Sequence, residues 1–174
     1  MATYKLDPMH AEVHFKVKHL MITNVTGSFQ KFDATMESEA ADFSDAAISF
    51  TADVNSISTN MEQRDEHLKS DDFFSAAKFP VLSFTSTGIT KTGDDAFTLT
   101  GNLTIRDVTN PVSLNVTYGG TMTDFYGQTK VGFELNGKIS RKDFGLTWNG
   151  VTEAGGIVVS DEVRLAMEIQ MIKQ

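Results

Sequence analysis

Apolar and polar residues alternate along much of this chain, and that period of two constrains the fold more than any other feature. The clearest case is residues 162–171, where the odd positions are Val, Leu, Met, Ile and Met, while Glu162, Arg164, Glu168 and Gln170 hold even positions. Successive side chains of a β-strand point to opposite faces of the sheet. The segment is therefore predicted to be a strand that buries one face.

The same alternation predicts eight strands in a single domain spanning residues 1–174. They cover residues 10–19, 32–36, 46–54, 82–84, 97–105, 112–118, 131–139 and 163–171. Turn-forming residues stand between them around Asn24 and Gly27, at 92–95, at 107–111 and at Gly119-Gly120. Antiparallel strands with one apolar face form a sandwich or a barrel, and closure into a barrel removes the exposed sheet edges. We predict an all-β fold, an eight-stranded antiparallel barrel.

One region between the third and fourth predicted strands breaks the period of two. Residues 59–62 have the Thr-x-x-Glu spacing of a helix capping box, and residues 63–69 continue as a helix. Ser70 is expected to begin a short turn, and Pro80 to end the region. We expect this helical insert to lie across one end of the barrel. Residues 145–160 form a second long irregular stretch, of the kind that often serves as a lid or binding loop.

The inward positions favour a container over a solid core. They include the small residues Ala34, Ala46, Ala52, Gly101 and Gly137, which leave volume that a filled core would occupy. An eight-stranded barrel is wide enough to hold one small ligand. For the two glycines, bulges or bends at a barrel corner are an equally good explanation.

The lining of such a cavity is predictable from strand parity, and it is almost entirely apolar. Each buried methylene contributes roughly 0.8 kcal/mol, so a long hydrocarbon chain binds without polar contacts to its tail. The expected lining residues are Phe15, Val17, His19, Phe32, Met36, Ile48, Phe50, Phe84, Leu99, Leu103, Phe133, Leu135, Leu165 and Met167.

A series of short motifs resembles the YceI-like family. In order they are Val-His-Phe-Lys-Val-Lys-His at 13–19, Thr-Gly-Ser-Phe at 26–29, Arg-Asp-Glu-His-Leu-Lys-Ser at 64–70, Asp-Phe-Phe at 72–74 with Phe-Pro at 79–80, Gly-Asn-Leu-Thr-Ile-Arg at 101–106, Thr-Asn-Pro-Val at 109–112, Arg-Lys-Asp-Phe-Gly at 141–145 and Asp-Glu-Val at 161–163. The resemblance implies an extended lipocalin-like barrel that binds polyisoprenoids or related amphiphiles such as isoprenoid quinones. Family members are commonly periplasmic and some are dimers, so a homodimer is one expectation. Two departures are Ala11, where the family often has Ser, and Asp107, where Gly is frequent.

Charge and composition exclude several classes of function. The net charge is -8 and no basic stripe is present, which argues against nucleic-acid binding. No apolar run approaches the ~18 residues that span a bilayer, so stable membrane insertion is not expected. With no Cys, thiol catalysis, thiolate metal sites and disulfides are excluded. No secretory signal is recognisable, which predicts a cytoplasmic protein, or a periplasmic one if the chain is a processed mature form.

The polar residues offer few candidate sites. His10 and His14 are too far apart on a strand to converge and His19 has the opposite parity, so we expect no metal and no cofactor. Arg64 and His67 lie three residues apart on one helix face and are predicted to meet a ligand head group at the barrel mouth. For Arg64 we favour a structural ion pair with a carboxylate. Arg106 and Arg141 each close a strand and have the same ambiguity.

Three hypotheses for function follow. The leading one is a non-enzymatic protein that binds a long-chain amphiphilic lipid, such as a polyisoprenoid or isoprenoid quinone, for transport, storage or sequestration. The second is an enzyme that acts on a lipid or quinone head group through Arg64, His67 or His19. The third is a filled barrel that binds a partner. No catalytic residue is assigned, because no nucleophile elbow, carboxylate pair or phosphate loop is present.

Overall fold

The protein is described here by a computed structural model that covers residues 2–20, 22–148 and 159–174. Within these residues the strands are β1 (Ala2–Leu6), β2 (Glu12–His19), β3 (Thr23–Phe29), β4 (Phe32–Ser38), β5 (Ala47–Asp53), β6 (Ile57–Ser58), β7 (Val81–Lys91), β8 (Ala96–Ile105), β9 (Val108–Thr123), β10 (Thr129–Ser140) and β11 (Val159–Lys173). The helix is α1 (Glu62–Lys69), and short 3₁₀ turns are η1 (Pro8–His10), η2 (Val54–Ser56) and η3 (Arg141–Phe144).

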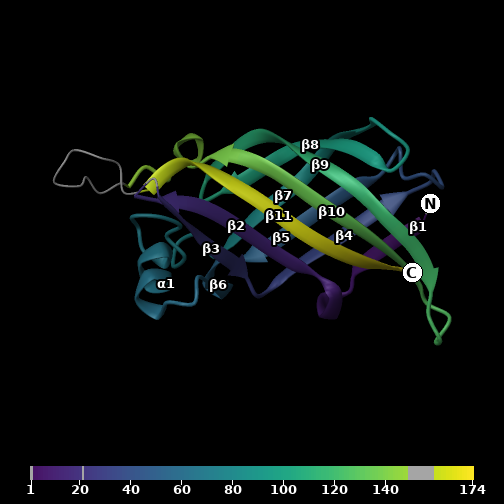
Figure 1. The fold of residues 1–174 in the computed structure, drawn as a ribbon, viewed down its shortest axis with the longest axis horizontal. Helices are drawn as coiled ribbons and strands as arrows, with labels where there is room; N and C mark the ends of the chain where they lie inside the picture. Colours follow the sequence, from purple (N-terminus) through teal and green to yellow (C-terminus); the bar gives the residue numbers. More distant parts are fainter. Residues whose placement is uncertain (1, 21, 149–158) are drawn as a thin grey trace.

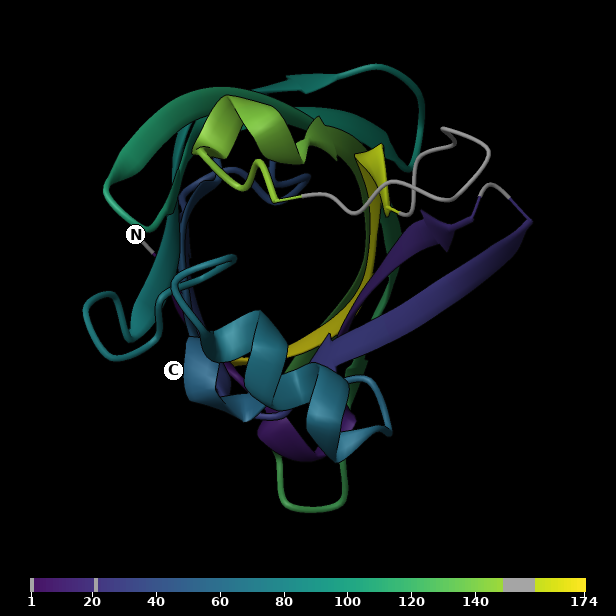
Figure 2. The ribbon, with the colours of Figure 1, turned by 90° about the vertical axis from the view of Figure 1, so that its left-hand side faces the viewer.

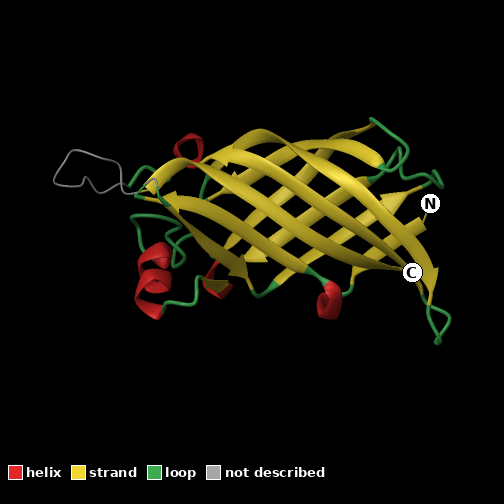
Figure 3. Ribbon diagram, viewed as in Figure 1, coloured by secondary structure: helices red, strands yellow, loops and turns green. Residues whose placement is uncertain are grey.

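The strands form one antiparallel sheet that closes on itself, because β11 pairs with β10 on one side and with β1 and β2 on the other. β1 and β2 follow one another along β11 and occupy one position in the wall. In the same way β4, which pairs with β1, and β3, which pairs with β2, together occupy the next position in the wall. The described residues thus form a closed eight-strand antiparallel barrel, and the predicted fold class is confirmed (Figure 1, Figure 3).

Three predicted turns contain strand residues in the structure. At the turn predicted for 107–111, the turn is confined to Arg106 and Asp107, and residues 108–111 already belong to β9. The residues around Asn24 and Gly27 belong to β3, whose Gly27 faces Phe15 of β2. Gly27 occupies an inward position of β3 but has no side chain, so the alternation of apolar and polar residues was not recognisable there. Gly119 and Gly120 lie inside β9, which continues to Thr123. The β9–β10 register shifts at this point, and Gly120 has a φ of 123°, so the glycines form a bulge instead of a turn.

The helical insert lies at one end of the barrel, where β3 pairs with the short β6 (Figure 2). Helix α1 is present as predicted, but the capping box is wrong. The N-cap is Met61, which makes no side-chain cap hydrogen bond. Instead, the Asp65 carboxylate accepts hydrogen bonds from the Thr59 backbone N at 2.8 Å and from Thr59 Oγ1 at 2.6 Å. Among the described residues, no helix is long and apolar enough to cross a membrane.

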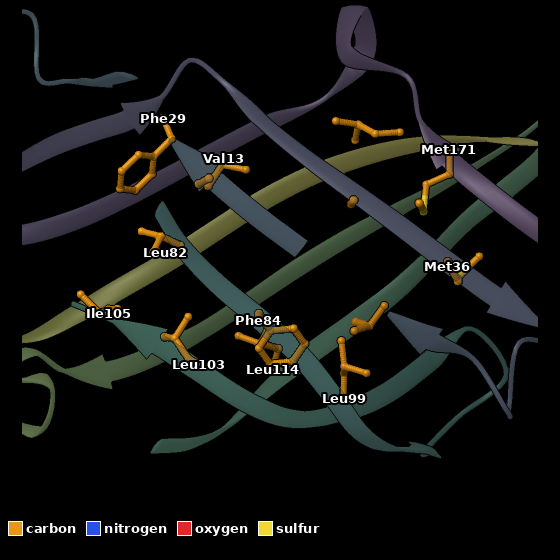
Figure 4. Close-up of a cluster of buried hydrophobic side chains, with 14 of the residues drawn as sticks. Val13, Phe29, Met36, Leu82, Phe84, Leu99, Leu103, Ile105, Leu114 and Met171 are labelled. Atoms are coloured by element: carbon orange, nitrogen blue, oxygen red, sulfur yellow. The ribbon is translucent and has the colours of Figure 1, made fainter. Parts of the chain in front are cut away.

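The inward faces of the strands form the core, and side chains from β2, β3, β4, β7, β8, β9 and β11 point into the barrel interior (Figure 4). The two glycines predicted to leave empty volume do not do so. A Cβ on Gly101 would lie 2.5 Å from Phe84 Cζ, and one on Gly137 would lie 2.6 Å from Leu114 Cδ2. Neighbouring side chains therefore fill both places. Gly101 also faces a bulge in β7, in keeping with the alternative explanation.

Candidate functional site

A cavity of about 380 Å³ lies inside the barrel. Its wall is built by alternate residues of the strands; on β11 these are residues 163, 165, 167, 169 and 171. Ala34 and Ala46 also line it, so these two small residues do border empty volume as predicted. The lining is overwhelmingly apolar, and the period of two in the sequence produces it directly.

The structure places thirteen of the fourteen predicted lining residues around this cavity. The exception is Phe32, whose expected place in the lining is wrong. The hairpin bends at Gln30 and Lys31, between β3 and β4, and Phe32 borders a separate surface hollow that also includes Pro8. Its ring packs against Phe50 at a centroid distance of 6.0 Å. That the thirteen residues contact a ligand stays a prediction.

Arg64 borders the cavity from α1, and its guanidinium ties the helix to the end of β6. Arg64 Nε donates to Thr59 Oγ1 at 2.8 Å, and Arg64 Nη2 donates to the Thr59 carbonyl at 2.9 Å. The expected partner was a carboxylate, but within the described residues no ion pair involves Arg64, so that detail of the prediction is wrong. Because Asp65 holds the same threonine, the backbone turn between β6 and α1 is fixed from both sides.

His67 also borders the cavity but has different neighbours from Arg64. Its Nε2 lies 2.9 Å from Asp72 Oδ2. Its ring stands edge-to-face against Phe73 and Trp148, at centroid distances of 5.1 and 4.8 Å. His67 thus links α1 to the chain that follows η3. Trp148 lines the cavity too, and the sequence reasoning did not assign it to the site.

Arg141 is the buried cation of the site, with only 3 % of its surface exposed. Its guanidinium donates to the carbonyls of Leu146 at 2.6 Å, Trp148 at 2.7 Å, Ser160 at 2.9 Å and Val159 at 3.1 Å. Burial lowers the pKa of Arg141, and the negative charge of Asp161 acts in the opposite direction. Arg141 therefore fixes both described ends of the irregular stretch predicted at 145–160. Residues 149–158 of that stretch lie outside the described residues.

The remaining histidines do not form a metal site in the described part of the chain, which contains no group of three His, Cys, Asp or Glu side chains placed to hold an ion. His14 Nε2 lies 3.1 Å from its neighbour Glu12 on the exposed face of β2. His19 is the last residue of β2 and borders the cavity, next to Lys18. His19 is thus at the mouth of the cavity.

The polar lining residues gather at one end of the cavity. Lys18 and His19 end β2, Thr59 and Arg64 flank the start of α1, and Arg141 begins η3; Figure 2 shows these elements together at one end of the barrel. The opposite end is lined by apolar residues such as Met36, Phe43 and Met171. The cavity therefore matches an amphiphile with a polar or anionic head at the α1 end and a hydrocarbon tail in the interior.

Sequence comparison shows what this chain is similar to. The family model for the YceI-like domain matches residues 4–171. "Protein YceI" of Salmonella newport (strain SL254) is 39 % identical over 175 residues, which cover 99 % of this chain and 88 % of that protein. "Protein YceI" of Salmonella arizonae has the same identity and coverage.

Three solved structures share the fold. A Campylobacter jejuni YceI protein has a TM-score of 0.79 and 34 % identity, covering 90 % of each chain. Burkholderia cenocepacia BcnA has a TM-score of 0.82 at 23 % identity, covering 95 % of this chain and 98 % of that one. A Saccharophagus degradans domain, described as a polyisoprenoid-binding domain implicated in plant cell wall breakdown, has a TM-score of 0.70 at 18 % identity and covers 98 % of each chain. At these identities the last two show the fold alone.

Proposed function

Because this chain belongs to the YceI-like family, we propose that its barrel binds one long-chain amphiphilic lipid of the polyisoprenoid or isoprenoid-quinone class, for transport, storage or sequestration. The observation that carries the proposal is the polarity gradient of the cavity, which has cationic and polar groups at the α1 end and apolar side chains elsewhere. The description of the Saccharophagus degradans domain as polyisoprenoid-binding supports the ligand class.

The chemistry of the mouth favours binding over catalysis. Arg64 and Thr59 direct their polar atoms at each other and at Asp65. The guanidinium of Arg141 donates hydrogen bonds to four backbone carbonyls. The hydroxyl beside a carboxylate here, Thr59 Oγ1, donates to Asp65 and accepts from Arg64 Nε, so it serves to hold the turn between β6 and α1. These groups instead make a rigid rim with positive charge.

The test is mass spectrometry of an organic extract from protein purified without detergent. A stoichiometric isoprenoid, quinone or related amphiphile would establish the proposed function and identify the ligand. An empty extract, repeated after incubation with candidate lipids, would overturn it in favour of a barrel that binds a protein partner. Turnover of such a lipid that is lost in His67→Ala would instead make the protein an enzyme.

Two further expectations stay predictions. Self-association into a homodimer is measurable by light scattering of the purified protein across a concentration series. The compartment, cytoplasm or periplasm, is measurable by fractionation of the native host.

A further inference from the structure

Phe43 lies at the end of the cavity opposite α1, on the loop that joins β4 to β5, at residues 39–46. Figure 1 shows this end of the barrel near the two chain termini, far from the helix. Phe43 is 7 % exposed and borders the cavity. It belongs to no strand, so the period of two did not assign it to the lining.

The ring of Phe43 reaches across the barrel. Its centroid lies 5.4 Å from that of Phe133 on β10 and 5.6 Å from that of Tyr118 on β9. In the strand order of the closed sheet, β9 and β10 are diametrically opposite β4 and β5. A third ring, Tyr4 on β1, stands edge-to-face at 5.7 Å. The four rings together form an aromatic floor, which we define as Tyr4, Phe43, Tyr118 and Phe133.

The loop is built to hold Phe43 in this position. Its φ of 63° lies in the left-handed region, which is unfavourable for a side chain of this size and persists only where the surroundings enforce it. Phe43 N donates to the Ala40 carbonyl at 3.2 Å and its own carbonyl accepts from Ala46 N at 3.1 Å. The Asp45 carboxylate holds the start of the loop by accepting hydrogen bonds from Ser38 Oγ at 2.7 Å and from the backbone N of Glu39 and Ala40 at 2.9 and 3.1 Å. In the same loop, Asp42 Oδ2 forms an ion pair with Lys91 Nζ at the end of β7, at a distance of 3.5 Å.

In the aromatic floor, Tyr4 and Phe43 are buried, and Phe43 borders the cavity. Tyr118 is only partly buried, and its hydroxyl meets the hydroxyl of Thr121. A hydrocarbon tail that enters at the α1 end therefore meets the ring of Phe43, which lies across the barrel at the opposite end of the cavity.

We propose that Phe43 sets the longest tail that the barrel accepts. This inference rests on the proposed function, since it concerns the tail of the same lipid. A tail short enough to end at the aromatic floor is fully buried. A longer tail leaves methylene groups in water at the mouth or displaces the head group from the rim, and it loses affinity for each unburied group.

The experiment compares wild type with Phe43→Ala, using farnesol, geranylgeraniol and solanesol as probes of increasing length and native mass spectrometry as the readout. We expect wild type to discriminate against solanesol relative to geranylgeraniol. Phe43→Ala should tighten solanesol binding by about tenfold or more, because burying even a few further methylene groups contributes that much.

The matched control is Phe32→Ala, which removes the same ring outside the cavity lining. Phe32 borders the separate hollow beside Pro8 and packs against Phe50. Phe32→Ala should leave the ratio of solanesol to geranylgeraniol affinity unchanged. An unchanged ratio in Phe43→Ala, with wild type binding the shorter alcohols, would overturn the role of Phe43. Wild type that binds no prenyl alcohol of any length would overturn the proposed function instead.

A second measurement needs no variant and so does not depend on the folding of Phe43→Ala. Geranylgeraniol that carries a photoreactive diazirine at its tail end is bound to wild type, irradiated and mapped by peptide mass spectrometry. We expect crosslinks at Phe43, Tyr118 or Phe133. Crosslinks confined to α1 or to Trp148 would place the tail at the other end and overturn the inference.

Discussion

The ring of Phe15 lies directly over the backbone of Gly27, its partner on the neighbouring strand. A Cβ added to Gly27 would meet Phe15 Cζ at 2.2 Å, closer than two carbon atoms can approach. Phe15 in turn packs against Phe29 at a centroid distance of 5.7 Å and borders the cavity. The absence of a side chain at residue 27 is therefore what lets an aromatic ring line this part of the wall.

Gly27→Ala should destabilise the protein because it forces the Phe15 ring out of its place. Overpacking of this kind costs about 1–3 kcal/mol, measurable as a lower midpoint of urea unfolding. Gly132→Ala is the matched control, since a Cβ there meets nothing within 4 Å and should change stability by only about 0.5 kcal/mol. Equal midpoints for the two variants would show that the Phe15 ring relocates at no cost.

Arg141→Met should destabilise the protein by roughly 2–4 kcal/mol, because it leaves the buried carbonyl of Leu146 and the partly buried carbonyl of Trp148 without this donor. Arg141→Lys should recover only part of the loss, since one ammonium cannot replace the planar guanidinium fork. Urea unfolding gives the magnitude, and the fluorescence of Trp148 reports the local change. The exposed Arg164, which lies 3.3 Å from Glu162, is the control. Arg164→Met should cost at most about 1 kcal/mol, and a similar cost for both variants would contradict the role of Arg141.

The loop that carries Phe43 should lose stability in acid through Asp45. The hydrogen bond from Ser38, together with those from the Glu39 and Ala40 backbone, holds the pKa of Asp45 below its ordinary value of 3.8. A lowered folded-state pKa means that the stabilisation is fully present above pH 3.8 and is lost as the pH falls below it. The stability difference between wild type and Asp45→Asn should therefore shrink as the pH is lowered.

Urea unfolding of wild type and Asp45→Asn at a series of pH values from neutral to about 2 checks this. Ser38→Ala removes the largest single cause of the lowered pKa, so it should weaken the same pH dependence without abolishing it. A wild-type advantage that stays constant down to the lowest pH would show that this carboxylate is not linked to folding.

Ala34→Phe should reduce lipid binding, because its new ring and the lipid tail compete for the same interior volume. We expect affinity for geranylgeraniol to fall by about tenfold or more, equivalent to the loss of a few buried methylene contacts. Thr35→Phe adds the same ring to the next residue of β4, which is exposed on the outer face, and should leave affinity unchanged. Undiminished binding by Ala34→Phe would place the lipid outside the barrel.

The sequence alone was sufficient for the wall of the cavity. Residues at alternate positions of a strand face the same side of the sheet, and the apolar side is the one that is buried. The apolar parity of each strand therefore predicts that Phe15, Ile48 and Leu165 point inward. The sequence was insufficient at Phe32, where the parity is right but the side chain, on the first residue of β4, borders the separate hollow beside Pro8. Glycines were ambiguous for a related reason, because the sequence does not show which neighbouring side chain covers them.

Only the tertiary structure decided how the two ends of the barrel are built. The partners of Arg141 are backbone carbonyls from two separate segments, and every residue offers a carbonyl, so no residue type marks them in advance. Phe43 lies in a loop with no period, and it became part of the cavity because closure of β11 on β1 brings β9 and β10 opposite that loop. Local alternation specifies which face of each strand is buried, whereas contacts across the barrel depend on closure, which joins residues far apart in the chain.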